Sequence, residues 1–189
     1  MFESSGDADV MQVERKSSFL PVVDANTCVL ILGSLPGERS LQASEYYAHP
    51  RNAFWRLVGE AIGIDLCAEV YGARLDILRE HGIGLWDSIG SARRRGSLDT
   101  ALRDIAPAPL AELVDSLPEL RAVAFNGSKS AQVARPQLVD HALALIDLPS
   151  SSPAYATMSF AQKASEWAQL AEFTVESCND RRGRALNPA

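Results

Sequence analysis

Ten consecutive residues in the first third of the chain combine aromatic, basic and amide side chains. They are Tyr46-Tyr47-Ala48-His49-Pro50-Arg51-Asn52-Ala53-Phe54-Trp55. Aromatic rings stack on flat ligands, and a carboxamide such as that of Asn52 donates and accepts hydrogen bonds at once. The Arg51 guanidinium suits a phosphate. This combination is typical of a site for a nucleic-acid base, where Asn52 would hold the base or a water molecule.

A second candidate is the loop Gly33-Ser34-Leu35-Pro36-Gly37, which directly follows an apolar run. Two glycines and a proline predict a tight loop whose backbone can approach a flat ligand closely, although an ordinary turn is the alternative. The loop lacks the lysine of the phosphate-binding G-x-x-x-x-G-K-[ST] pattern.

Several of these residues also have a plainer interpretation. Asn52 stands where a helix should begin, so its amide is also a candidate helix cap. One of Tyr46 and Tyr47 is expected in the core. Asp87 can position a base or cap the next element, and Asn126 precedes a glycine, which is also a turn signal.

The elements that must position these residues follow from the apolar pattern. Strands covered on both faces are predicted over 28–32, 83–86, 121–125 and 142–146, where apolar character is continuous. Helices are predicted from Asn52 to about Gly63, over about 68–81, and after the capping-box pattern that begins at Ser159. The alternation predicts a three-layer α/β/α fold with a central, mainly parallel, four-stranded sheet. Ligands then bind at the carboxyl ends of the strands, where GSLPG, WDS, NGS and LPSSSP follow.

Composition favours one ordinary globular domain. The chain has 189 residues, of which 47% are hydrophobic and 22% charged, with a net charge of −6. We expect a disordered tail over 1–18, the domain over 19–178, and a flexible tail over 179–189. The sequence has no export signal and no apolar run of ~18 residues. We therefore expect a cytoplasmic protein. The three cysteines lie far apart, which predicts neither a zinc site nor an iron–sulfur cluster.

The string GSLPG…YYAHPRNAFW resembles the first motif of the uracil-DNA glycosylase superfamily, and it is most similar to the hypoxanthine-DNA glycosylases called family 6. The mismatch-specific uracil glycosylases share the pattern aromatic-A-H-P-x-N-x-F-W. The likeness continues in order through four later segments, which are 84–88, 93–98, 125–127 and 148–153.

This resemblance implies the predicted fold and the hydrolysis of an N-glycosidic bond in DNA, with a deaminated base flipped out of the helix. It implies that Asn52 is catalytic, that Tyr47 stacks on the base, and that the backbone of Ser34 and Leu35 lines the base pocket. Further candidates for base binding are Phe54, Asp87 and Asn126. The candidates for DNA contact are Arg51, Arg93, Lys129, Ser150, Ser151 and Ser152.

Two departures from the superfamily pattern narrow the expected subfamily. Many members have Asp or Asn where this chain has Leu35, and the best-known uracil enzymes have His where it has Leu148. Asn52 must therefore supply more of the polar chemistry, as the resemblance to family 6 implies. The expected activity is a monofunctional DNA-deoxyinosine glycosylase without a metal or cofactor. A lyase would need an amine nucleophile, and none of Lys16, Lys129 and Lys163 lies in the core motif.

The expected partner is DNA containing deaminated bases, bound by a monomer. Two alternatives stay open. One is a uracil or mismatch-specific DNA glycosylase, which differs in the size of the base pocket. The other is a non-catalytic α/β module that binds a nucleotide or a protein, for which replacement of Asn52 by Ala would leave binding intact.

Overall fold

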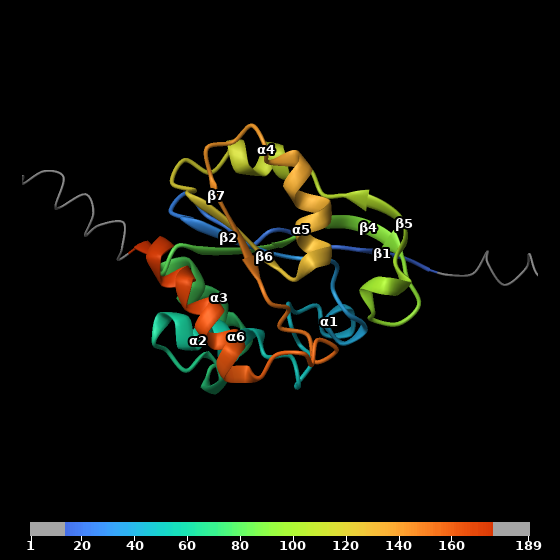
Figure 1. The fold of residues 1–189 in the computed structure, drawn as a ribbon, viewed down its shortest axis with the longest axis horizontal. Coiled ribbons are helices and arrows are strands. Elements are labelled where there is room, and N and C mark those ends of the chain that lie inside the picture. The colour runs from blue at the N-terminus through green and yellow to red at the C-terminus, as the bar shows by residue number, and fades with distance from the viewer. Residues whose placement is uncertain (1–13, 176–189) are drawn as a thin grey trace, which may run out of the picture.

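A parallel four-stranded sheet forms the centre of the computed structural model, which describes residues 14–175 (Figure 1). Its strands lie in the order β3-β2-β6-β7, and each neighbouring pair is parallel. The bounds are Val29–Gly33 for β2, Ile83–Asp87 for β3, Ala122–Asn126 for β6 and Ala144–Leu148 for β7. The predicted sheet is confirmed, although β7 begins two residues later than expected.

Helices cover both faces of this sheet, as the continuous apolar strands require. On one face, α2, α3 and α6 pack against Val29, Ile31 and Leu85; on the other, α4 and α5 pack against Leu30 and Val123 (Figure 1). The α-helices are α1 Glu38–Ala43, α2 Phe54–Ile62, α3 Tyr71–Glu80, α4 Leu110–Asp115, α5 Ser128–Ala134 and α6 Phe160–Trp167. The 3₁₀ turns are Leu66–Ala68, Asp99–Ala101, Arg135–Gln137 and Ala168–Phe173.

The capping box predicted before the last α-helix is confirmed. The Ser159 hydroxyl accepts a hydrogen bond from the Gln162 amide, and the Gln162 side chain accepts one from the Ser159 amide. The apolar stripe that follows is core, because Trp167 and Leu170 are completely buried. This helix therefore starts where local chemistry places it.

A second sheet was not expected from the sequence. It is antiparallel and three-stranded, in the order β1-β4-β5, with β1 Arg15–Ser17, β4 Ile89–Arg93 and β5 Arg103–Pro107. The strand β1 falls within the tail predicted over 1–18, so that tail boundary is wrong for residues 15–17. Their polar side chains give no strand pattern, and the pairing partner is supplied by the backbone of β4. Residues 1–13 and the predicted tail over 179–189 lie outside the described residues.

Within residues 14–175, no helix combines the length and the apolar character needed to cross a membrane. Cys28 is buried beside the first strand of the parallel sheet, as expected for a core residue, and Cys67 is exposed.

Candidate active site

The four strand-end loops gather at one edge of the parallel sheet, as predicted. The strand register places Gly33 opposite Asp87 and Asn126 opposite Leu148. Backbone hydrogen bonds join the first two loops, since the Ser88 amide donates to the Gly33 carbonyl at 2.8 Å. The residues that the sequence analysis singled out are thereby brought to the same edge from distant parts of the chain.

Ser151 connects three of the site segments to one another. Its amide donates to Asn126 Oδ1 at 2.8 Å, and its hydroxyl accepts from Asn126 Nδ2 at 2.9 Å. Its carbonyl accepts from the Ala53 amide at 3.0 Å, directly beside Asn52. Ser151 is 1% exposed. A residue expected to contact DNA therefore has a structural role as well, because it links the final motif to the segment that carries Asn52.

Asn52 Oδ1 accepts a hydrogen bond at the start of α2, and the Asn52 side chain still has an unengaged NH₂ group. The N-cap residue of α2 is Ala53, so Asn52 stands one residue earlier than the cap position expected for it. Its Oδ1 accepts from the Phe54 amide at 3.0 Å, and its backbone amide donates to the His49 carbonyl at 2.8 Å. Among the described residues, none accepts a hydrogen bond from Asn52 Nδ2. An amide oxygen has two lone pairs, so Oδ1 can also accept a second hydrogen bond. The side chain is thus oriented by the helix and is equipped to bind a ligand or a water.

Tyr47 is held in a conformation that few bulky residues adopt. Its φ is +54°, in the left-handed region. Its ring stacks on Phe54 with 3.7 Å between centroids and 7° between planes, and its hydroxyl accepts from Asn126 Nδ2 at 3.3 Å. Burial and the nearby Asp87 carboxyl raise the pKa of Tyr47, so its hydroxyl stays neutral. Backbone strain of this kind is often found at functional sites.

Phe54 lies behind Tyr47 rather than on the surface of the site. It is 0% exposed and also contacts Trp55 and Trp167 edge to face. The expectation that Phe54 contacts the base is therefore not met in this conformation. It acts as the support on which the Tyr47 ring rests.

Asp87 carries a buried carboxyl group that lies next to Gly33. It is 3% exposed, and its Oδ2 accepts from the Ser18 hydroxyl at 2.7 Å. Burial raises its pKa to about 7, against the opposing effects of the Ser18 hydrogen bond and the Arg94 charge. A Cβ at Gly33 would come within 2.6 Å of Asp87 Oδ1 and 3.1 Å of the Tyr47 hydroxyl. Only glycine at position 33 therefore admits both groups.

The loop 33–37 presents its backbone while its side chains point elsewhere. The Ser34 hydroxyl donates to Asp99 Oδ1 at 2.7 Å. The Leu35 side chain is buried in a small cluster with Ile89, Ala92 and Leu102, residues of the second sheet and its flank. The Leu35 side chain therefore packs away from the other candidate site residues, and the backbone role expected for Leu35 stays a prediction.

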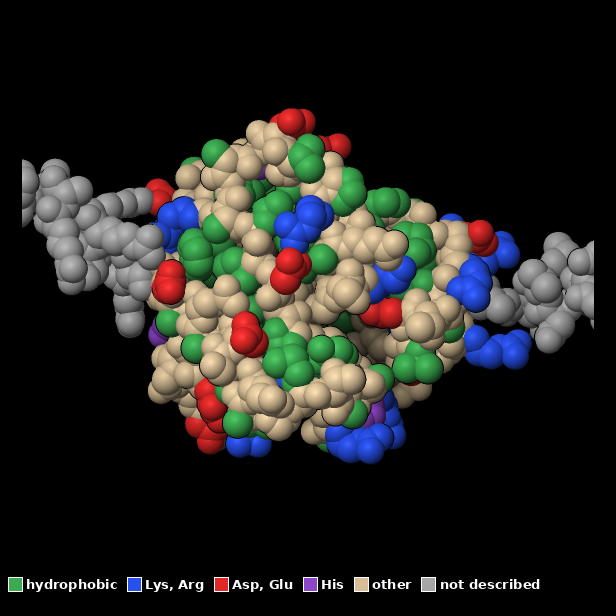
Figure 2. Space-filling view, viewed as in Figure 1, with side chains coloured by type: hydrophobic (Ala, Val, Ile, Leu, Met, Phe, Trp, Pro, Cys, Tyr) green, Lys and Arg blue, Asp and Glu red, His purple; other side chains and the backbone are tan. Residues whose placement is uncertain are grey.

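The candidate phosphate contacts are spread around this edge. Arg51 is exposed beside Asn52. Arg93 lies on the second sheet, where its Nε is 3.6 Å from Asp104 Oδ2. Lys129 lies on α5, where its Nζ is 2.7 Å from Gln132 Oε1. Figure 2 shows Lys and Arg side chains at the end of the molecule formed by the second sheet and along the lower edge, with a hollow between the region of α5 and that edge. The net charge of −6 is thus compatible with local basic surfaces.

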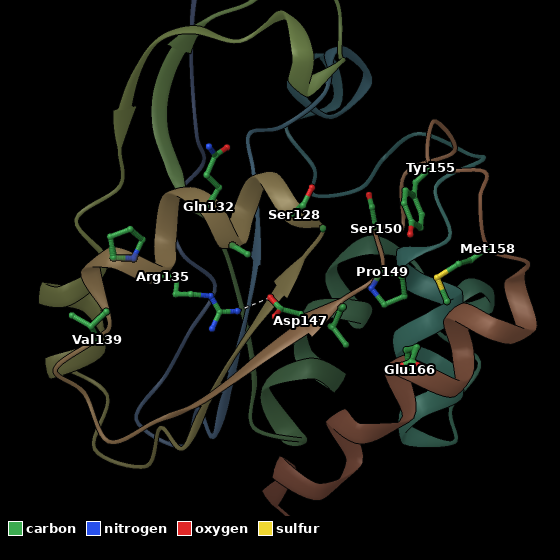
Figure 3. A pocket seen from close by; sticks show the side chains of 14 residues that line it. Ser128, Gln132, Arg135, Val139, Asp147, Pro149, Ser150, Tyr155, Met158 and Glu166 are labelled. Atoms are coloured by element: carbon green, nitrogen blue, oxygen red, sulfur yellow. Dashed lines mark hydrogen bonds and ion pairs between the residues drawn. The ribbon is translucent and has the colours of Figure 1, made fainter.

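A groove of about 990 Å³ runs along α5 and β7 (Figure 3). It meets the strand-end loops at Gly127 and Ser150, and Figure 3 shows Tyr155 beside Ser150. Gly127 has a φ of +95°, and a Cβ there would lie 3.0 Å from Ser150 Cβ. Neither Asn52 nor Tyr47 lines the groove, so it extends the site rather than forming its centre.

Three residues at the site were missed by the sequence analysis. Ser18 was assigned to a tail, Arg94 was one of three consecutive arginines, and Asp99 follows a stretch without apolar pattern. Their contacts depend on the unexpected second sheet, so no local signal identified them. Among the described residues, no group of three or more His, Cys, Asp or Glu side chains is placed to hold a metal ion.

Comparisons with known proteins show the family and the fold of this chain. Residues 20–173 match the sequence profile of the uracil DNA glycosylase superfamily. A protein of Methanosarcina acetivorans named hypoxanthine DNA glycosylase is 40% identical over 152 residues, which are 80% of this chain and 95% of the relative. A Methanosarcina barkeri protein of the same name is 46% identical over 118 residues, 62% of this chain and 75% of the relative. An M. acetivorans protein solved by NMR and provisionally assigned as a uracil DNA glycosylase superposes with a TM-score of 0.76 at 39% identity. That match covers 84% of this chain and 97% of that one.

Proposed function

Because the chain belongs to the uracil DNA glycosylase superfamily, we propose that it is a DNA glycosylase that releases hypoxanthine from deoxyinosine. Two relatives at 40% and 46% identity carry the name hypoxanthine DNA glycosylase. The observation that carries the proposal is the state of Asn52, a neutral amide oriented by the Phe54 amide with its Nδ2 unengaged. A catalytic side chain must be positioned before the substrate arrives. The hydrogen bond from the Phe54 amide positions the Asn52 side chain in this way.

The reaction breaks the bond between C1′ of the sugar and the base. The electron pair leaves with the base, and water adds to an electron-poor C1′. A strong general base is unnecessary, because the water needs only to be placed for attack. Asn52 Oδ1 has a second lone pair for that water, while Nδ2 can donate to an acceptor on the substrate. Asn52 therefore serves as the catalytic residue.

The base would rest between the Tyr47 ring, the backbone of the loop 33–37 and the Asp87 carboxyl. Phe54 holds the Tyr47 ring in place from behind. Asp87 Oδ1 accepts no hydrogen bond from the described residues and lies next to Gly33, so it is available to the polar edge of a flipped base. Asn126 fixes Tyr47 and Ser151 and is assigned a supporting role.

DNA would cross the edge of the sheet where the loops gather. Ser150 and Ser152 are placed to contact phosphate oxygens there, together with Arg51, Arg93 and Lys129. Phosphate contacts position the duplex and carry no sequence preference of their own. We propose that the protein acts on DNA as a monomer.

The proposal is tested with oligonucleotides that contain a single inosine, followed by alkaline cleavage of abasic sites. Wild-type protein should release hypoxanthine under single-turnover conditions, and Asn52→Ser should not, although serine keeps a capping oxygen. Folded wild-type protein that cleaves no lesion would instead favour a non-catalytic binding module.

Release of uracil is the second candidate, and it is favoured by the likeness to a structure provisionally assigned as a uracil DNA glycosylase. Oligonucleotides with a single uracil, opposite guanine or adenine, decide between the substrates in the same assay. A faster single-turnover rate on uracil than on inosine would reverse the assignment of substrate and leave the class of enzyme unchanged.

A further inference from the structure

A buried arginine that directly follows β4 of the second sheet holds the backbone of the loop 33–37. Arg94 is 1% exposed. Its Nη1 donates to the Leu35 carbonyl at 3.2 Å, and its Nη2 donates to the Pro36 carbonyl. Burying a guanidinium is costly unless it makes strong contacts. Two successive carbonyl groups of the candidate base-binding loop provide those contacts.

Arg94 belongs to a segment, residues 94–99, that contacts this loop at several points; we call it the clamp segment. Asp99 accepts from the Ser34 hydroxyl at 2.7 Å, and the Ser97 hydroxyl accepts from the Glu38 amide at 2.9 Å. The clamp segment thus makes hydrogen bonds to Ser34, Leu35, Pro36 and Glu38. The loop is held by side chains and not only by its own turn.

The contact with the Pro36 carbonyl determines which way the Pro36–Gly37 peptide group points, whereas the nitrogen that follows the Leu35 carbonyl belongs to Pro36 and carries no hydrogen. No described peptide bond is cis, so each N–H is directed away from the carbonyl of its own peptide group. The Pro36 carbonyl faces Arg94, which turns the Gly37 N–H to the opposite side. The Leu35 side chain also packs toward the second sheet. Within residues 14–175, the Gly37 amide has no hydrogen-bond partner, so it remains available as a donor. The Leu35 amide is also unpaired there, but its peptide group is oriented by the Ile89 amide, which donates to the Ser34 carbonyl at 3.0 Å.

Arg94 is the buried positive charge behind the loop. Burial lowers the pKa of Arg94, against the opposing effects of the Asp99 and Asp87 carboxylates. Burial and the nearby Arg94 charge lower the pKa of Lys16. Lys16 forms an ion pair with Glu38. Asp99 is also engaged by Ser34. Arg94 is therefore the cation that directly contacts the loop's carbonyls.

We propose that Arg94 is a positioning residue that orients and polarises the Pro36–Gly37 peptide group, so that the outward Gly37 N–H stabilises the negative charge of the departing base. The bond from C1′ to the base breaks with its electron pair on the base. Water then bonds to C1′, and its proton passes to the base or to solvent. Arg94 acts through the Pro36–Gly37 peptide group and does not touch the base. It supplies positive charge in a chain that has Leu148 where the best-known uracil enzymes have a histidine. The inference rests on the proposed glycosylase function.

The test compares leaving bases of different acidity in the same folded protein. Arg94→Met removes the charge, Arg94→Lys keeps it with poorer geometry, and Arg79→Met on the surface of α3 is the control for loss of one arginine. Single-turnover rates are measured on the base that wild type releases fastest and on its ring-fluorinated derivative, which leaves more readily as an anion. Equilibrium binding is measured with DNA carrying a non-hydrolysable 2′-fluoro nucleotide.

Loss of a preorganised donor to a developing anion slows catalysis by about 10²–10³-fold. We expect Arg94→Met to lose about that factor on the parent base and at least several-fold less on the fluorinated one, with Arg94→Lys between wild type and Met. Binding of the 2′-fluoro DNA should stay within a few-fold. The ratio of the two rates does not depend on the folded fraction, and Arg94→Lys provides a second variant if Met prevents folding.

Equal losses on both bases, or a loss confined to DNA binding, would overturn the role of Arg94 while leaving the glycosylase assignment intact. Failure of wild type to release any base would overturn the proposed function and this inference with it. The two failures are therefore distinguishable.

Discussion

Replacing Asp87 by Asn should make the protein more stable at alkaline pH. The folded protein raises the pKa of this carboxyl from 3.8 to about 7, because burial penalises the ionised form. That difference of about 3 pKa units corresponds to about 4 kcal/mol at pH values above both pKa values. Asn removes the charge and retains an oxygen to accept from the Ser18 hydroxyl.

The direction in which the free energy of unfolding changes with pH follows from the number of protons that each state binds. Between pH 4 and 7 the folded state keeps the Asp87 proton that the unfolded state has lost, so the wild-type free energy of unfolding falls as pH rises through this window. Above about pH 7 both states are ionised and this contribution becomes constant. The variant should therefore match wild type near pH 4 and exceed it by up to about 4 kcal/mol at pH 8.

Urea denaturation at several pH values between 4 and 9 measures this difference directly. Asp140→Asn, at an exposed position, is the matched control and should show no such divergence from wild type. A difference between Asp87→Asn and wild type that is constant with pH, or a variant that is less stable at pH 8, would refute the reasoning. If the variant is more stable but releases base more slowly, the carboxylate is retained for function at a cost in stability.

Three further substitutions test the site and its scaffold. Asn52→Ser should leave the free energy of unfolding within about 1 kcal/mol of wild type, because the serine oxygen can still accept from the start of the helix. It should reduce the single-turnover rate of base release by at least about 10²-fold. A release rate near that of wild type would remove Asn52 from the mechanism. Ser151→Ala deletes a buried hydroxyl that accepts from Asn126, so urea denaturation should show a loss of about 1–3 kcal/mol, with slower release because Tyr47 and Asn52 are both attached to this network. Ser159→Ala breaks the capping box of α6 and should cost about 1 kcal/mol in urea denaturation without changing the release rate per folded molecule; a change in that rate would mean that α6 contributes to the site.

The parts of the fold that were predicted from sequence are those with a local cause. Continuous apolar runs identified β2, β3, β6 and β7, because a strand covered on both faces needs no polar positions. The pattern at Ser159 identified the start of α6, because both hydrogen bonds of a capping box lie within four residues. The gathering of the strand-end loops followed from the parallel order.

The second sheet had no such local cause. The polar residues of β1 pair with β4, which is more than 70 residues away, and β5 alternates weakly and is mostly exposed. The buried position of Arg94 depends on that sheet, and in the sequence it cannot be told apart from its exposed neighbour Arg93. Long-range pairing of backbone groups therefore accounts for both the missed sheet and the missed site residues.

The two interpretations of Asn52 turn out to be compatible rather than competing. The contact with the start of α2 uses only the oxygen of the side-chain amide, because Oδ1 accepts from the amide of Phe54, the first residue of the helix, while Ala53 is the N-cap residue. Catalysis as proposed uses Nδ2 and the remaining lone pair of Oδ1. Capping fixes the orientation of the amide plane, which lowers the entropy lost when a substrate is bound. A serine at position 52 keeps the first function and loses the second, and for this reason it separates them better than an alanine does.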